Sequence, residues 1–220
     1  MPRGLFVTGT DTGVGKTVVA ATLLHRYRGG RLLRYWKPIQ TGVESDDDTA
    51  DVARMAGCDD REIFGHGVRL PRPLSPHLAA RLDGCTIDAD RLLEAFRRED
   101  RDARWIVEGA GGVLVPINDR ETMADLMVRL DLPVVIVART ALGTINQTLL
   151  TIEALRLRAL EVVGVVMVGH QDSDACEAVE RYGRVVVLGQ MPIFAPLTSS
   201  ALATWAPQLD PTGRLIGYFS

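Results

Sequence analysis

Lys16 and Thr17 follow a glycine-rich segment, a pattern typical of a loop that binds phosphate. Residues 9–17 read Gly-Thr-Asp-Thr-Gly-Val-Gly-Lys-Thr and stand between an apolar run at 5–7 and a helical pattern at 18–24. Glycines let backbone N–H groups turn toward phosphate oxygens, and the following helix adds its positive N-terminal end. The lysine reaches the terminal phosphates, and the threonine hydroxyl binds Mg²⁺. We therefore expect a phosphate ligand at this loop.

The loop departs from the strict phosphate-binding pattern at one position. That pattern has glycine at position 10, where this chain has Thr10, and Gly9 stands one residue earlier. A structural turn followed by a chance Lys-Thr pair is the alternative interpretation. The order of strand, loop, lysine, hydroxyl and helix favours phosphate binding over that alternative.

Two other strand ends carry residues that could take part in chemistry. Lys37 follows a predicted strand at 32–36 and precedes an expected Pro/Gly loop, a place where open α/β sheets bind ligands. A solvated surface lysine explains this feature better on its own. Glu108 ends an apolar strand that begins at Trp105 and precedes a glycine-rich turn at 109–112. Because a buried carboxylate is costly unless it is paired with a cation, Glu108 is a candidate metal ligand. An ordinary glutamate at a strand end is an equal alternative.

An acidic run precedes a predicted helix near residue 50. Asp46, Asp47 and Asp51 suit the N-terminal end of this helix, where carboxylates interact favourably with the helix dipole. One carboxylate of the run that faced the phosphate site could hold Mg²⁺. The residue pattern alone does not say which one.

Strands alternate with helices along the chain, and this alternation predicts one α/β domain over residues 1–220. We expect a doubly wound, mainly parallel sheet with helices on both faces, like that of P-loop NTPases. The expected strands lie at 5–7, 32–36, 105–108, 133–138, 162–168 and 185–188. The expected helices lie at 15–28, after Pro76, and at 90–98, 122–130, 142–155, 174–182 and 201–205. Residues 66–76 contain three prolines and are expected to be irregular, either as a lid or as a connector.

Composition excludes several classes of function. The chain of 220 residues is 46% hydrophobic and 24% charged, with a net charge of −3 and no basic block, so we expect no nucleic-acid partner. No apolar segment resembles a signal peptide or a membrane span, so no membrane partner is expected. The three cysteines are far apart and form neither a disulfide framework nor a metal motif, which favours a cytoplasmic location.

Together these motifs resemble the dethiobiotin synthetase family, within the wider group of MinD-like P-loop proteins. The resemblance covers most of the chain. It is carried by residues 7–17, 37–42, Asp48, 75–77, 107–112 and 142–146. Many MinD-like proteins have a second lysine early in the phosphate loop, where this chain has Asp11, and this difference favours the synthetases.

The resemblance implies an ATP-dependent ligase of biotin biosynthesis. The family joins CO₂, supplied from bicarbonate, to 7,8-diaminononanoate and closes a ureido ring, with ATP as substrate and Mg²⁺ as cofactor. A carbamate and a carbamic-phosphoric anhydride are the implied intermediates. The family also implies a homodimer with each site at the subunit interface.

The resemblance also assigns site residues at matching positions. The implied catalytic residues are Lys37, Lys16 and Thr12. The implied metal ligands are Thr17, Asp48 and Glu108. The nucleotide-binding residues are Thr10, Asp11, Thr12, Gly13, Val14, Gly15, Lys16, Thr17, Val168, Gly169 and Pro192. The substrate-binding residues are Thr12, Lys37, Thr41, Gly111, Leu142, Gly143, Thr144, Ile145 and Asn146, the last five receiving the substrate carboxylate of the opposite subunit.

Two departures from the family pattern concern the nucleotide. Some members have a glutamate where this chain has Gly13, and some have an asparagine that reads adenine where this chain has Val168-Gly169. An apolar side chain cannot supply the paired donor and acceptor of an amide. We therefore hypothesise loose selectivity for the nucleobase.

Three other functions compete with this interpretation. A MinD-type regulatory ATPase is disfavoured by Asp11 and by the absence of a basic amphipathic C-terminal helix. A cobyrinate-type amidating ligase needs a glutaminase domain, for which 220 residues leave no room. A catalytically inactive nucleotide-binding module is disfavoured by Lys16, Thr17, Lys37 and Glu108.

Overall fold

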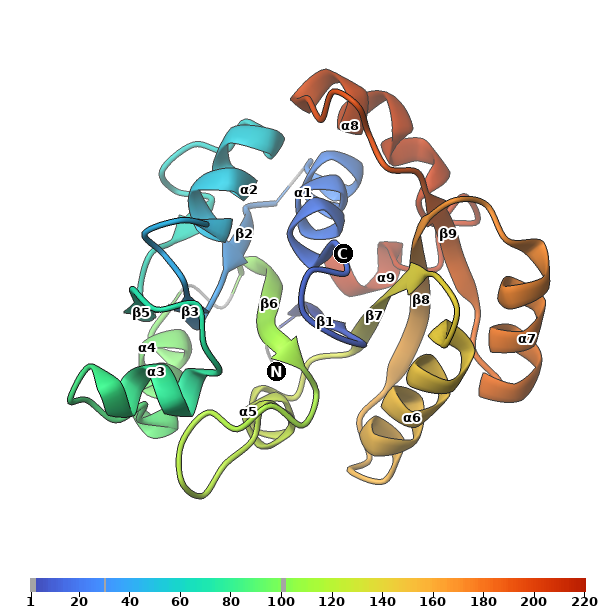
Figure 1. Cartoon of the computed structure of the whole chain (residues 1–220). Helices are drawn as coiled ribbons and strands as arrows, with labels where there is room; N and C mark the ends of the chain where they lie inside the picture. Colours follow the sequence, from blue (N-terminus) through green and yellow to red (C-terminus); the bar gives the residue numbers. More distant parts are fainter. Residues whose placement is uncertain (1–2, 30, 100–101) are drawn as a thin grey trace.

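A seven-stranded parallel sheet forms the centre of the molecule in a computed structural model, which describes residues 3–29, 31–99 and 102–220 (Figure 1). The strand order is β4-β2-β6-β1-β7-β8-β9. The strands are β1 (Arg3–Gly9), β2 (Leu33–Trp36), β4 (Ile63–Phe64), β6 (Arg104–Gly112), β7 (Val134–Thr140), β8 (Val162–Gly169) and β9 (Val187–Met191). All of these strands pair in parallel.

Helices cover both faces of the sheet, as the alternation of elements predicts. One face packs against α1 (Lys16–Tyr27), α2 (Asp48–Ala56) and α8 (Ser199–Trp205). The other packs against α3 (Pro76–Leu82), α4 (Ala89–Arg97), α5 (Met123–Leu130), α6 (Thr144–Arg156) and α7 (Ser173–Gly183). Successive residues of β1 alternate between the faces: Leu5 and Val7 lie in the α1 core and Phe6 lies in the α5 core. A short 3₁₀ helix (Ala206–Gln208) and α9 (Ile216–Phe219) complete the chain.

The sheet topology brings the candidate residues together at the C-terminal ends of the strands. Strand β1 lies between β6 and β7, and the phosphate loop leaves its C-terminal end and enters α1 directly. Lys37 follows β2, on the other side of β6, and Glu108 lies within β6. In parallel sheets all C-terminal strand ends lie at the same edge, so residues distant in sequence come together there.

A second, two-stranded sheet shows that two of our expectations were wrong. Strand β3 (Ile39–Thr41) lies where a loop was expected after Lys37, and β5 (Val68–Leu70) lies within the segment expected to be irregular. The two strands pair in parallel, with Ile39 opposite Val68. Strands this short are set by long-range pairing rather than by an alternating pattern, so a local reading of the sequence does not detect them.

The expectation of a glycine-rich turn at 109–112 was also wrong, because β6 continues to Gly112 and the turn comes after it. Gly109 is required by packing: a Cβ there would lie 2.9 Å from Cε1 of Phe6.

The last strand, β9, begins two residues later than predicted, and the helix α9 was not expected. Among the described residues no helix is both long enough and apolar enough to span a bilayer.

Candidate active site

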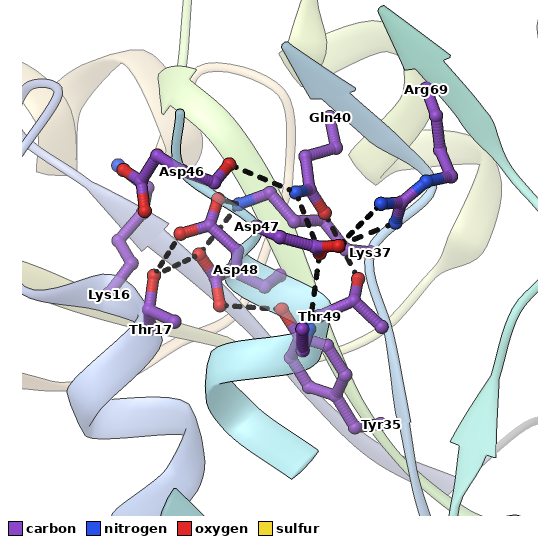
Figure 2. Close-up of polar contacts among 12 residues, drawn as sticks. Lys16, Thr17, Tyr35, Lys37, Gln40, Asp46, Asp47, Asp48, Thr49 and Arg69 are labelled. Atoms are coloured by element: carbon purple, nitrogen blue, oxygen red, sulfur yellow. Dashed lines mark hydrogen bonds and ion pairs between the residues drawn. The ribbon is translucent and has the colours of Figure 1, made fainter. Parts of the chain in front are cut away.

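Four side chains converge beside the phosphate loop. The ammonium Nζ of Lys37 lies 2.6 Å from Oδ2 of Asp48 and 2.7 Å from Oε1 of Glu108. The Thr17 hydroxyl donates to Oδ1 of Asp48 at 2.7 Å, and it lies 3.1 Å from Oε1 of Glu108. Figure 2 shows Lys37, Thr17 and Asp48 pointing toward one another from three separate elements. We call Thr17, Lys37, Asp48 and Glu108 the carboxylate–lysine cluster.

The first turn of α2 decides which acidic residue joins the cluster. Asp47 caps this helix, because its Oδ1 accepts from the Ala50 N–H at 3.1 Å. Gln40 and Arg69 hold the same carboxylate at 3.1 and 2.6 Å, as Figure 2 shows. With Asp47 fixed in this way, the next residue, Asp48, points to the phosphate loop. The expectation that Asp47 serves the helix end is therefore confirmed.

Burial makes the charges of the cluster interdependent. Glu108 is fully buried and Lys37 is 8% exposed, so Lys37 is not the solvated surface lysine that its sequence position alone favours. Burial opposes the charge of Lys37, but the carboxylates of Glu108 and Asp48 outweigh it and raise the pKa of Lys37. Burial likewise opposes the charge of Asp48, yet the Lys37 ammonium holds the pKa of Asp48 below its usual value. One buried cation thus stabilises two carboxylates by direct ion pairs.

Lys16 is the second cation of the site. It is 6% exposed, and its Nζ donates to the carbonyl of Asp11 across the loop at 3.0 Å. Burial lowers the pKa of Lys16, partly offset by the charge of Glu108. The helix N-cap, Gly15, has φ 101°, a conformation that L side chains rarely adopt, and a Cβ there would also lie 3.3 Å from Val168. Glycine at this position therefore lets the backbone turn into α1.

A cleft of about 760 Å³ opens at the carboxylate–lysine cluster. The cluster residues lie in its wall. Six further residues predicted for the site also line it, namely Thr12, Gly13, Gly15, Lys16, Thr41 and Gly111, as does Asp46 of the acidic run. The proline-rich segment contributes Pro73, Leu74, Ser75 and Pro76, and so forms one wall of the cleft. Leu197, from the loop between β9 and α8, also lines it.

Several predicted site residues lie outside this cleft. Thr10 donates its backbone N–H to Val137 of β7 at 2.9 Å, and Val14 is buried in the α1 core. Further predicted residues absent from the cleft wall are Asp11, Val168, Gly169, Pro192, Leu142, Gly143, Thr144, Ile145 and Asn146. The last five precede or begin α6, and Leu142 is fully exposed. Their assigned roles stay predictions.

Sequence analysis missed three residues beside the cluster. Tyr35 donates its phenol to Oε2 of Glu108 at 2.9 Å, Gln40 supports Asp47, and Leu197 comes from a distant loop. The signal that could have found Tyr35 is strand alternation, which places it on the same face of the sheet as Glu108. Burial and the charge of Glu108 raise the pKa of Tyr35 well above its usual range, so the phenol stays a donor.

The donor set of the cluster suits Mg²⁺. Two carboxylates and a hydroxyl converge, and Mg²⁺ binds hard oxygen ligands, commonly one or two carboxylates together with substrate phosphates. In the part of the chain that the structure describes, no group of three or more His, Cys, Asp or Glu side chains could hold a metal. Among the described residues, Mg²⁺ at this cluster would therefore need phosphate oxygens as further ligands.

Comparison with known proteins gives concordant matches. A family model described as an AAA domain matches residues 3–201. The ATP-dependent dethiobiotin synthetase BioD of Agrobacterium fabrum is 46% identical over 196 residues, which cover 89% of each chain. The BioD of Rhodopseudomonas palustris is 45% identical over 202 residues, 92% of this chain and 91% of that protein.

A longer relative and a solved structure extend this comparison. The biotin biosynthesis bifunctional protein BioCD of Bordetella avium is 44% identical over 98% of this chain, which spans only 45% of that protein. The cell division ATPase MinD of Pyrococcus furiosus superposes with a TM-score of 0.58 at 17% identity, covering 96% of this chain and all of that one. This structural similarity supports the P-loop ATPase fold alone.

Proposed function

Because the chain belongs to the family of ATP-dependent dethiobiotin synthetases, we propose that it converts 7,8-diaminononanoate and CO₂ to dethiobiotin with cleavage of ATP to ADP and phosphate. One amine takes up CO₂ and loses a proton, giving a carbamate. A carbamate oxygen attacks the γ-phosphorus of ATP and ADP leaves. The second amine attacks the carbon of the resulting anhydride, and phosphate leaves as the ring closes.

The observation that carries this proposal is the convergence of Lys16 and Lys37 on one cleft beside a phosphate loop. Phosphoryl transfer needs positioning and charge neutralisation more than covalent participation by the protein. Lys16 is held over the loop, where it neutralises charge on the terminal phosphates. Lys37 comes from the opposite wall and shares the charge that develops on the transferred group.

Thr17, Asp48 and Glu108 would hold Mg²⁺ at the phosphates. When bound there, the metal supplies positive charge that favours departure of ADP. The protein's own part is to present these oxygens from α1, α2 and β6 in a fixed arrangement. In the proposed complex Lys37 exchanges its carboxylate partners for phosphate oxygens, so the ion pairs of the cluster are the resting arrangement of the site.

Thr12, Thr41 and Gly111 line the same cleft and are proposed to contact the diamine and its carbamate. Thr12 lies in the phosphate loop, whereas Thr41 ends β3. The two threonines therefore suit the carbamate end and the diamine end of one substrate respectively. We further propose that the reaction takes place in the cytoplasm, where the three free cysteines stay reduced.

We propose a homodimer in which the N-terminal end of α6 completes the site of the partner subunit. Leu142 is fully exposed and Leu150 is 57% exposed, so apolar surface lies along this helix. We expect sedimentation velocity to give a species of twice the 24.0 kDa of one chain. Mixing Lys37→Met and Asn146→Ala subunits should restore activity that neither has alone, because one site of each mixed dimer is intact. A monomer at assay concentrations would contradict the proposal.

Loose nucleobase selectivity is a further expected result. Val168 packs at the phosphate loop where an amide would read adenine, and it offers no hydrogen bond. We expect kcat/KM values for ATP, GTP and CTP within about tenfold of one another, the equivalent of one unpaired hydrogen bond. The measurement is diamine-dependent phosphate release with each nucleotide. Val168→Asn should raise the preference for ATP, and a strong ATP preference in the unmodified chain would refute the hypothesis.

The proposed reaction is tested by following the carbon of CO₂ into the product. We expect incubation with Mg-ATP, ¹³C-bicarbonate and 7,8-diaminononanoate to give dethiobiotin that carries one ¹³C at the ureido carbon, detected by mass spectrometry. Omission of ATP should abolish the labelled product. ATP cleavage without labelled product would exclude the synthetase reaction and favour a switch ATPase.

A further inference from the structure

Tyr35 reaches the carboxylate–lysine cluster from the neighbouring strand β2, on the same face of the sheet as Glu108. In the register of β2 and β6, Tyr35 lies opposite Ile106, two residues before Glu108. Side chains two residues apart on a strand share a face, so Tyr35 lies diagonally to Glu108 on the α1 side of the sheet. The phenol spans this diagonal and donates to Oε2 of Glu108 at 2.9 Å. Figure 2 shows the Tyr35 ring below the cluster residues.

The two oxygens of Glu108 have different kinds of partner. Oε1 lies 2.7 Å from Nζ of Lys37 and 3.1 Å from the Thr17 hydroxyl. Both of these partners line the open cleft, and the proposed function reassigns both when Mg-ATP binds. Oε2 is held by Tyr35, which is fully buried in β2, between β4 and β6, and does not line the cleft. Its phenol is therefore the partner of Glu108 that stays in place when the others change.

We propose that Tyr35 is a positioning residue for Glu108, whose phenol holds Oε2 so that Oε1 remains directed at Thr17 and the phosphates. A carboxylate with one anchored oxygen keeps a single orientation, and partners of this kind tune the affinity of metal ligands. Tyr35 touches neither substrate nor metal and acts through Glu108 alone. This inference rests on the proposed function, because that function assigns Glu108 to Mg²⁺.

The chain offers a matched control for Tyr35→Phe. Tyr27 also donates its phenol to a carboxylate, Oδ2 of Asp210, at 2.6 Å. It is the last residue of α1, whereas Thr17 is the second, so ten residues of helix, about 15 Å, separate it from the cluster. Tyr27→Phe thus removes the same kind of hydrogen bond without touching the site. Each variant keeps the aromatic ring in its packing.

The test compares metal binding and turnover in the full chain. We expect Tyr35→Phe to raise the Mg²⁺ concentration for half-maximal, diamine-dependent ADP release about 10-fold or more. The dissociation constant of Mn²⁺ in the presence of ADP, measured by electron paramagnetic resonance, should rise in parallel. Tyr27→Phe should lower the melting temperature while leaving both metal constants unchanged. Equal metal constants in Tyr35→Phe and the unmodified chain would overturn the inference.

A second pair of variants, Glu108→Gln with and without Tyr35→Phe, keeps the inference testable if Tyr35→Phe alone folds poorly. It also separates the inference from the proposed function. The neutral amide of Glu108→Gln does not leave a charge buried without a donor, so Tyr35→Phe is better tolerated in that background. There we expect Tyr35→Phe to change the Mn²⁺ constant by less than about twofold, because its effect passes through the Glu108 charge. A full additional effect would refute action through Glu108. Mn²⁺ binding needs no diamine, so failure of diamine-dependent turnover in the unmodified chain contradicts the proposed function alone.

Discussion

Replacement of Lys37 by methionine is expected to lower the kcat of diamine-dependent ADP formation roughly 10²–10³-fold, the usual effect of removing one group that stabilises developing charge. The KM for ATP should change less, because Lys16 and the loop backbone remain. The measurement is steady-state ADP release at saturating Mg²⁺. Retention of more than about a tenth of kcat would contradict the role of Lys37.

The loss must be separated from a loss of stability. Lys37→Met leaves Glu108 buried without its cation, so we expect the free energy of unfolding to fall by about 3 kcal/mol. Arg28→Met is a suitable control, because it removes the Arg28–Glu62 ion pair, which is 2.7 Å long and lies outside the cleft, and it should leave kcat unchanged. Single-turnover rates at a temperature where all variants are folded remove the remaining ambiguity.

Lys37→Arg tests the shape of the cation as well as its charge. The printed sequence contains only two lysines, Lys16 and Lys37, and all its other basic side chains except the histidines are arginines. A guanidinium is planar and wider than an ammonium, and it does not fit between two carboxylates that lie 2.6 and 2.7 Å from one nitrogen. We expect Lys37→Arg to be nearly as inactive as Lys37→Met. Near-normal turnover would show that only charge matters.

The second large effect is expected at Glu108. Glu108→Gln keeps the size of the side chain but removes its charge, so we expect it to weaken the contact with Lys37 and the proposed binding of Mg²⁺. We expect kcat to fall on the order of 100-fold and the half-activating Mg²⁺ concentration to rise, measured by titrating Mg²⁺ at saturating ATP. Glu62→Gln, in the ion pair with Arg28, is the control. An unchanged Mg²⁺ profile in Glu108→Gln would remove Glu108 from the metal site.

Much of this site is local in sequence and could be predicted. The phosphate loop carries its chemistry within nine residues, and apolar runs mark the strand before Lys37 and the strand that contains Glu108. The doubly wound fold followed from the alternation of strands and helices. A carboxylate in a buried strand was expected to need a cation, and the structure pairs Glu108 with Lys37, whereas its role as a metal ligand stays a prediction.

The remaining features depend on contacts between distant segments. Strand β3 is specified by its pairing with β5, and Tyr35 by the register of β2 against β6. The assignment of Asp48 rather than Asp47 depends on Gln40 and Arg69 of the two-stranded sheet, whose side chains donate hydrogen bonds to the carboxylate of Asp47. Apart from the strand alternation that places Tyr35 on the face of Glu108, these contacts leave no periodic or compositional signal. The turn expected after Glu108 failed because its glycine serves close packing against Phe6.

In the proposed reaction, the carboxylate–lysine cluster promotes transfer of the γ-phosphoryl group of ATP to a carbamate made from the diamine. The most direct measurement is ADP release from Mg-ATP and bicarbonate, with and without 7,8-diaminononanoate, in the unmodified chain and in Lys37→Met. We predict release that depends on the diamine and is lost in the variant. Release at the same rate without the diamine would contradict the account and favour a regulatory ATPase.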